Sequence, residues 1–114
     1  MYVNNVVIVG NVTGDPRRNA EGEAGAVGFR MAVNRWRTPG AQGAEDKAAR
    51  TEFIDVEVWG SQAENVLESL GRGDRVIVAG QLRYDQWEKD GELKTRLKIK
   101  ALAVGRSLEF GSIS

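Results

Sequence analysis

Four large aromatic residues are spread through the chain among arginines and lysines, at positions Trp36, Phe53, Trp59 and Trp87. An aromatic ring stacks on a nucleic-acid base of any type for about 1–3 kcal/mol, and cations beside the ring can bind the phosphates. For one ring taken alone, burial in a core is the ordinary interpretation, because Trp and Phe are large and apolar. Because all four avoid the aliphatic face of their strand, or lie in a hairpin beside a cation, they favour an exposed stacking surface.

A row of cations lies on one face of the last predicted strand. Lys94, Arg96, Lys98 and Lys100 alternate with uncharged residues, so their side chains repeat about every 7 Å. That spacing resembles the phosphate interval of an extended single strand. A solvated edge strand, protected from aggregation by its charges, would show the same pattern. The other candidate phosphate ligands are Arg30, Arg72 and Arg83.

The chain lacks the residues on which most catalytic and metal sites depend. It has no cysteine and no histidine, which removes disulfides, thiol chemistry, the commonest general base and the commonest metal ligand. Asp55 and Glu57 share a strand face with two of the rings, but an acid-base or metal site would need further polar groups. Ion pairs across the sheet with Arg30 or Arg96 are the expected use of these carboxylates. Most enzyme mechanisms therefore lack their usual residues here, and a metal site is not expected.

The charge of the chain is segregated although its total is zero. Residues 1–71 carry 7 Lys or Arg and 10 Asp or Glu, whereas residues 72–114 carry 9 and 6. A neutral protein can therefore present a positive face to an anionic partner. The sequence contains no apolar run of membrane-spanning length and begins in an alternating strand instead of a signal sequence, which predicts a cytoplasmic protein.

Three β-strands are predicted in the first half of the chain. Residues 6–9 are apolar and rich in β-branched side chains, and the turn residues Gly14-Asp15-Pro16 follow. Residues 27–36 and 53–59 alternate strictly, with aliphatic side chains and Phe29 on the face expected to be buried. Residues 37–50 show no apolar periodicity and are expected to form a long loop, either functional or a tolerated flexible insertion.

One helix and two further strands are predicted in the second half. Ser61 and Glu64 match a capping box, an apolar stripe at helical spacing follows them, and Gly71 stands where a left-handed C-cap is expected. Residues 75–83 then form a strand, and Asp90-Gly91 is a hairpin turn that leads into a strand from residue 92 to 104.

The predicted element order is β-β-β-α-β-β in one domain. An all-β, five-stranded OB-fold barrel with one short α-helix between the third and fourth strands has this order at this chain length. A small sandwich with one helix would also fit the pattern. We assign the domain to residues 1–110, and residues 111–114 to the start of a C-terminal tail or the end of a shortened chain.

Six short motifs, in order, give the chain a resemblance to the bacterial single-stranded DNA-binding protein family. The similarity covers roughly residues 1–110, and its motifs are Val9-Gly10-Asn11, Gly14-Asp15-Pro16, Thr51-Glu52-Phe53, Val58-Trp59-Gly60, Gln62-Ala63-Glu64-Asn65, and Gly80-Gln81-Leu82-Arg83 followed by Trp87.

This resemblance implies a bacterial OB-fold protein that assembles as a homotetramer and has no catalysis and no cofactor. Such a protein binds single-stranded DNA without sequence preference and protects it in replication, recombination and repair, in the cytoplasm at the nucleoid. Phe53, Trp59 and Trp87 match the stacking aromatics of the family, Trp36 lies one residue from a fourth, and Arg72 falls where the family has a DNA-contacting Lys. Replication and repair proteins are expected as partners only if an acidic tail exists beyond Ser114.

The chain differs from the family pattern in two places, and two other functions would fit its residues. Asp55 and Glu57 replace neutral or basic residues between the stacking aromatics, so affinity is expected to differ. The chain stops at Ser114, where family members usually continue into a linker and an acidic tail; this fits a core that has been cut back or a short paralogue. A single-stranded RNA-binding OB protein, or an OB fold used for protein interaction, would have much the same residue pattern.

Overall fold

The computed structural model describes residues 1–18, 25–34 and 51–109. The described strands are β1 (Val6–Val12), β2 (Arg17–Arg18), β3 (Val27–Asn34), β4 (Thr51–Val58), β5 (Arg75–Lys89) and β6 (Glu92–Arg106), and helix α2 (Gly60–Ser69) lies between β4 and β5. The predicted long loop, Trp36 and the predicted tail at residues 111–114 lie outside the described residues.

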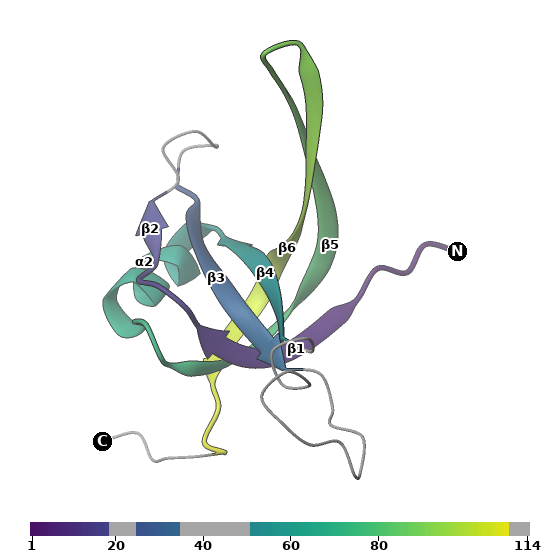
Figure 1. Ribbon diagram of the computed structural model, residues 1–114. Coiled ribbons are helices and arrows are strands. Elements are labelled where there is room, and N and C mark those ends of the chain that lie inside the picture. The colour runs from purple at the N-terminus through teal and green to yellow at the C-terminus, as the bar shows by residue number, and fades with distance from the viewer. Residues whose placement is uncertain (19–24, 35–50, 110–114) are drawn as a thin grey trace, which may run out of the picture.

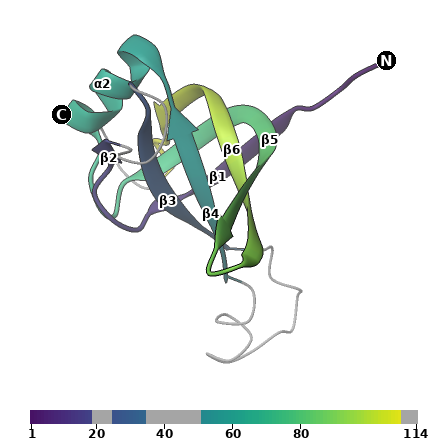
Figure 2. The ribbon, with the colours of Figure 1, turned by 90° about the horizontal axis from the view of Figure 1, so that it is seen from above.

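The strands close into a barrel. The sheet order is β1-β5-β6-β4-β3-β2, and an additional pairing joins β1 to β3. The strands β1, β5, β6, β4 and β3 therefore form a ring of five, with the two-residue β2 on the edge of β3 (Figures 1 and 2). All neighbours are antiparallel except β4 and β6, which run parallel. This topology confirms the predicted five-stranded OB-fold barrel and excludes the sandwich.

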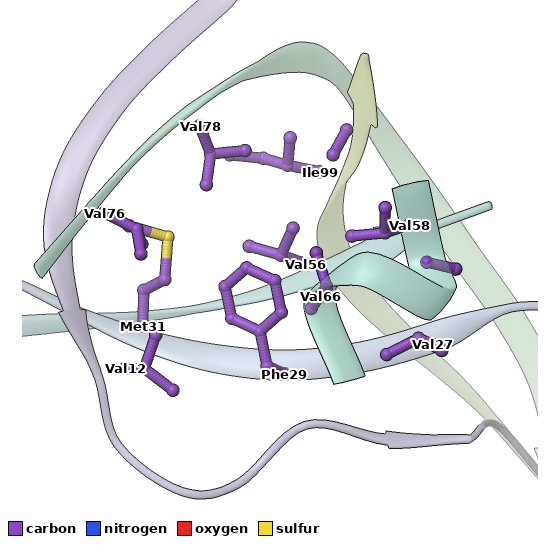
Figure 3. Packing of buried hydrophobic residues seen from close by; sticks show 12 residues of the cluster. Val12, Val27, Phe29, Met31, Val56, Val58, Val66, Val76, Val78 and Ile99 are labelled. Atoms are coloured by element: carbon purple, nitrogen blue, oxygen red, sulfur yellow. The ribbon is translucent and has the colours of Figure 1, made fainter. Parts of the chain in front are cut away.

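The alternation of the strands supplies the core. Val27, Phe29 and Met31 on β3 are buried, as predicted, and meet the buried side chains of the other strands (Figure 3). Two glycines allow strands to approach closely where the barrel closes. A Cβ on Gly10 would collide with the carbonyl oxygen of Ala32 on β3, and a Cβ on Gly80 would collide with that of Lys100 on β6.

Strands β5 and β6 extend well beyond the barrel. β4 pairs with β6 over Asp55–Glu57 and Lys98–Lys100, whereas β5 and β6 continue to pair with each other up to Lys89 and Glu92. Residues 82–97 therefore form a two-stranded projection, here called the arm, which rises from the barrel in Figure 1. Asp90 and Gly91 at its tip both have positive φ, at 53° and 78°, which is the conformation of the predicted two-residue hairpin turn.

Helix α2 covers one end of the barrel with the predicted apolar stripe. Ala63 and Val66 are buried, and Leu67 and Leu70 pack against the core. The side chain of Gln62 ties the helix to β6 where the β5–β6 register shifts. Its amide donates to the Leu102 carbonyl at 3.2 Å and accepts from the Val104 amide at 2.8 Å. Gln62 thus pairs backbone groups beside the irregularity.

Both predicted helix caps are wrong. The N-cap is Trp59, in extended conformation and without a side-chain cap, because Gly60 at φ 71° turns the chain into the helix before Ser61. Glu64 instead accepts two hydrogen bonds from the Arg18 guanidinium, at 2.8 and 2.7 Å, which is a bidentate carboxylate pair. The helix ends at Leu70 in extended conformation, and Gly71 does not have positive φ.

Candidate nucleic-acid interface

An open groove of about 890 Å³ crosses the barrel face formed by β3 and β4. The turn after β1 and strand β2 line one side, and the root of the arm lines the other. Five cations and four carboxylates line it: Arg17, Arg18, Arg30, Arg96 and Lys98, with Asp15, Asp55, Glu57 and Asp85. The groove is thus strongly charged and nearly balanced in sign.

The predicted stacking rings within the described residues remain outside the core. Phe53 on β4 is 60% exposed, and Trp87 on the arm is 40% exposed. Trp59, at the end of β4, is half-buried, and its indole Nε1 donates to Glu57 Oε1 at 3.0 Å. The prediction that these rings avoid the aliphatic core is therefore confirmed for Phe53 and Trp87, and holds in part for Trp59.

Cations lie directly over two of these rings. The Arg96 guanidinium carbon is 5.4 Å from the centroid of the Trp87 ring, and the Lys100 ammonium is 5.9 Å from that of Trp59. These distances are within the range of a cation–π attraction. Trp59 and Trp87 are therefore each accompanied by a positive charge, and aromatic rings together with cations are the components of single-strand binding surfaces.

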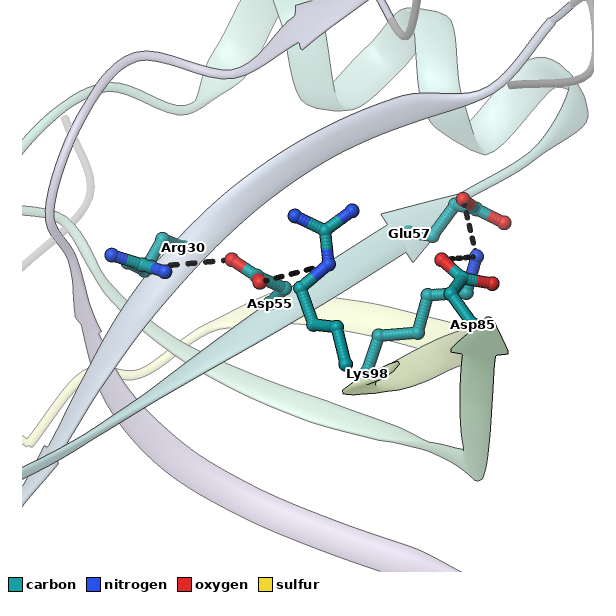
Figure 4. A network of polar contacts seen from close by, with 6 residues as sticks. Arg30, Asp55, Glu57, Asp85 and Lys98 are labelled. Atoms are coloured by element: carbon teal, nitrogen blue, oxygen red, sulfur yellow. Dashed lines mark hydrogen bonds and ion pairs between the residues drawn. The ribbon is translucent and has the colours of Figure 1, made fainter. Parts of the chain in front are cut away.

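Asp55 binds two of the groove cations. Asp55 pairs with the Arg30 side chain at 3.2 Å and with that of Arg96 at 3.6 Å (Figure 4). The sequence predicted both partners for the carboxylates of β4, and the structure confirms them for Asp55. These pairs form because Arg30 is the register partner of Asp55 on β3 and because the parallel pairing brings β6 to its other side.

Glu57 has a different partner from the one expected. Its Oε2 accepts from the Lys98 ammonium at 2.8 Å, and Asp85 on the arm binds the same ammonium at 2.9 Å. Burial by itself lowers the pKa of Lys98, but hydrogen bonds to Glu57 and Asp85 outweigh this effect and raise the pKa above its ordinary value. Lys98 is therefore cationic. From β6 it joins Glu57 on β4 to Asp85 on the arm (Figure 4).

One face of the arm brings together most of the predicted cations with Trp87. The cross-strand partners are Trp87 with Lys94, Asp85 with Arg96, and Arg83 with Lys98, and partners in register project to the same side of a sheet. Arg83 is exposed and donates to Gln81 at 3.3 Å, and Lys94 pairs with Glu92 at 2.8 Å. This face of the arm continues the charged groove outward.

Arg72 lies apart from this assembly. It is exposed in the turn between α2 and β5 and does not line the groove. Its backbone amide donates to Asp15 Oδ1 at 3.1 Å, which ties the turn to the one after β1. The structure therefore places Arg72 next to Asp15, which lines the groove, although Arg72 itself does not line it.

Two arginines of the groove and an exposed ring of the arm are not among the site residues predicted from the sequence. Arg17 and Arg18 line the groove, and the signal was a pair of arginines directly after a predicted turn. The hydrogen bonds to Glu64 raise the pKa of Arg18. Tyr84 is an exposed aromatic of the arm, but by alternation it projects from the side opposite Trp87.

The described residues contain no cluster of three or more acidic side chains placed to hold a metal ion. Within the same residues, no helix is long and apolar enough to cross a membrane.

A closed five-stranded barrel with one helix between β4 and β5 defines a protein of the OB-fold class. Its surface carries a charged groove and two aromatic rings that lie beside cations. The model of the single-strand binding protein family matches residues 3–107. The chain therefore belongs to this family.

Individual relatives agree with the family match. The chain is 35% identical over 108 residues to a single-stranded DNA-binding protein of Paenarthrobacter aurescens, covering 94% of this chain and 63% of the relative. It is 35% identical over 103 residues to that of Treponema pallidum, covering 90% and 56%. The chain thus spans about three fifths of the length of these curated relatives.

A solved structure matches the fold over nearly the whole chain. It is the crystal structure of the small single-stranded DNA-binding protein from Streptomyces coelicolor, with a TM-score of 0.71 and 31% sequence identity. The match covers 97% of this chain and 100% of the other. The fold of the present chain is therefore shared with a solved member of the family.

Proposed function

We propose that this protein binds single-stranded DNA without sequence preference and protects it during replication, recombination and repair, as a nucleoid protein without catalysis. The observation that carries the proposal is the pairing of a ring with a cation at two places, Trp59 with Lys100 and Trp87 with Arg96. Stacking accepts any base because every base has an aromatic face. The relatives described above are single-stranded DNA-binding proteins, which supports the same ligand.

The binding unit is residues 1–110, and each candidate residue has one of two tasks. Bases stack on the rings, and phosphates contact the cations. The stacking set is Trp36, Phe53, Trp59 and Trp87, and the phosphate set is Arg30, Arg72, Arg83, Lys94, Arg96, Lys98 and Lys100. Arg17 joins the phosphate set because it lines the groove.

The chain is further proposed to act as a homotetramer. Val7, Val9 and Ile77 are exposed side by side on the outer face of β1 and β5, because Val9 and Ile77 are register partners. Leu82, Leu93 and other apolar side chains are exposed on the arm, and exposed apolar patches of this kind mark association surfaces. Sedimentation equilibrium tests the assembly: a mass near four chains is expected, and a monomer mass at micromolar concentration would contradict it.

Tryptophan fluorescence during titration with oligo-dT tests the DNA proposal. Stacking on Trp59 and Trp87 is expected to quench the emission, and raising the salt concentration is expected to weaken binding because phosphate contacts release counterions. Duplex DNA of equal length is the control. Unquenched emission, or equal affinity for the duplex, would contradict the proposal.

Oligo-rU of the same length distinguishes DNA from RNA. Stacking alone accepts both polymers, and discrimination depends on contacts to the 2′-hydroxyl. We expect dT to bind more tightly than rU. A preference for rU would assign the protein to RNA, and no response to either polymer would leave the exposed rings and apolar patches as surfaces for protein interaction.

A further inference from the structure

The carboxylates in the groove occupy the cations that a DNA strand would need. Asp55 lies between Arg30 and Arg96, and its side chain is 26% exposed. The carboxylate is thus accessible from the groove that it helps to line. A phosphate that binds either arginine must first displace the Asp55 carboxylate from it. The bound phosphate then lies close to this carboxylate, and the two negative charges repel each other.

Arg96 joins Asp55 to the arm. Its guanidinium lies over Trp87 and also pairs with Asp55, so one side chain connects a carboxylate of the barrel to a proposed stacking ring. Asp85 and Glu57 restrain Lys98 at the root of the arm in a similar way. The ion pairs within the groove therefore compete with anions for Arg30, Arg96 and Lys98. Asp55 competes most directly, because it pairs with two of these cations.

We propose that Asp55 sets the strength and the salt dependence of single-strand binding, by holding Arg30 and Arg96 in ion pairs that phosphates must replace. Asp55 is a positioning residue in this proposal, because it acts through the two arginines. The inference rests on the proposed DNA binding and deepens it. Its consequence is a protein that binds single strands more weakly, and with less sensitivity to salt, than the number of its cations would give.

The expected effects can be estimated from counterion release. For single strands, the logarithm of the binding constant falls with the logarithm of the salt concentration by about 0.7 per phosphate neutralised. Releasing two arginines should therefore steepen this slope by up to about 1.4. At about 0.1 M salt, each new phosphate contact strengthens binding about fivefold, and two contacts strengthen it about twenty-five-fold.

The test compares Asp55→Asn with the wild-type chain in oligo-dT titrations at four salt concentrations. Asparagine keeps the shape of the side chain and removes its charge. We expect binding about five- to twenty-five-fold tighter at 0.1 M salt, together with the steeper slope. Asp85→Asn should have a smaller effect, because Lys98 keeps its pair with Glu57.

Glu68→Gln is the matched control. Glu68 is exposed on α2 and does not line the groove, and its substitution changes the net charge by the same amount as Asp55→Asn. The affinity and slope of Glu68→Gln should equal those of the wild type. Equal tightening by both variants would overturn the proposal, because a general change in charge would then be the cause.

A double-mutant cycle with Arg96→Gln isolates the contact. If Asp55 acts through Arg96, the tightening by Asp55→Asn must shrink in the Arg96→Gln background. Unchanged affinity and slope for Asp55→Asn, with thermal stability retained, would overturn the inference while the wild type still binds oligo-dT. A wild-type chain that does not bind would instead overturn the proposed function itself.

Discussion

The barrel and the arm share strands β5 and β6 but use the alternation of these strands differently. In the barrel, Val76, Val78 and Ile99 are buried by the facing strands and by α2. On the arm, residues of the same parity, such as Leu82 and Leu97, are exposed. Alternation therefore assigns side chains to a face, but only a neighbouring element makes that face a core.

The two regions also hold their cations differently. Lys98 at the root of the arm is largely enclosed and binds two carboxylates, whereas Lys94 near the tip is exposed and pairs with Glu92. The sequence pattern makes these lysines equivalent members of one row. Their different surroundings predict different contributions to stability and binding.

The largest expected difference between barrel and arm concerns apolar truncation on β6. Ile99→Ala should lower the free energy of unfolding by about 2–5 kcal/mol, because Ile99 is completely buried. Leu97→Ala, two residues earlier in the same strand, should cost less than about 1 kcal/mol, because Leu97 is 44% exposed.

Urea denaturation at a fixed protein concentration measures both values, since assembly couples stability to concentration. Equal losses of unfolding free energy for the two variants would contradict the difference between barrel and arm. They would show that the apolar side of the arm is buried in the assembled protein.

The next difference concerns the rings. Trp87→Ala and Trp59→Ala should each weaken oligo-dT binding at least tenfold, about 1.4 kcal/mol. Trp87→Ala should leave the unfolding midpoint nearly unchanged. Trp59→Ala should also lower stability by about 1 kcal/mol, because it removes the hydrogen bond to Glu57.

Tyr84→Ala is the control for the rings, because Tyr84 is an exposed aromatic on the other side of the arm. Its affinity for oligo-dT should match that of the wild type. If Tyr84→Ala weakens binding as much as Trp87→Ala, the strand does not follow the charged face of the arm.

The smallest expected difference concerns the two lysines. Lys98→Ala should lower the free energy of unfolding by about 1 kcal/mol near pH 7, because Glu57 and Asp85 lose their shared partner. Lys94→Ala should cost less, because exposed ion pairs contribute little.

The pH dependence follows from the raised pKa of Lys98. A pKa raised in the folded state stabilises the protein fully below the unfolded pKa, near 10.4, and this stabilisation is lost as the pH rises through the folded pKa. The difference in unfolding free energy between the wild type and Lys98→Ala should therefore be constant from about pH 7 to 10 and shrink above that. A gap that shrinks as the pH falls from 10 to 7 would contradict the assignment.

Local sequence determined much of the fold. The period of two on β3 places Val27, Phe29 and Met31 inside because successive strand residues point to opposite faces. Asp90-Gly91 determined the hairpin, because few other dipeptides tolerate two positive φ values in succession. The exposure of Phe53 and Trp87 followed from the same alternation.

Only the tertiary structure decided how the groove is charged. Glu57 and Lys98 are 41 residues apart in sequence, and they meet because β4 pairs in parallel with β6. No local pattern encodes such a pairing, since its register depends on how the whole barrel closes. The same closure brought Arg18 to Glu64 and overrode the local capping signal. The sequence by itself determined which rings and cations are present and which face each occupies; the barrel determined which cations are already paired.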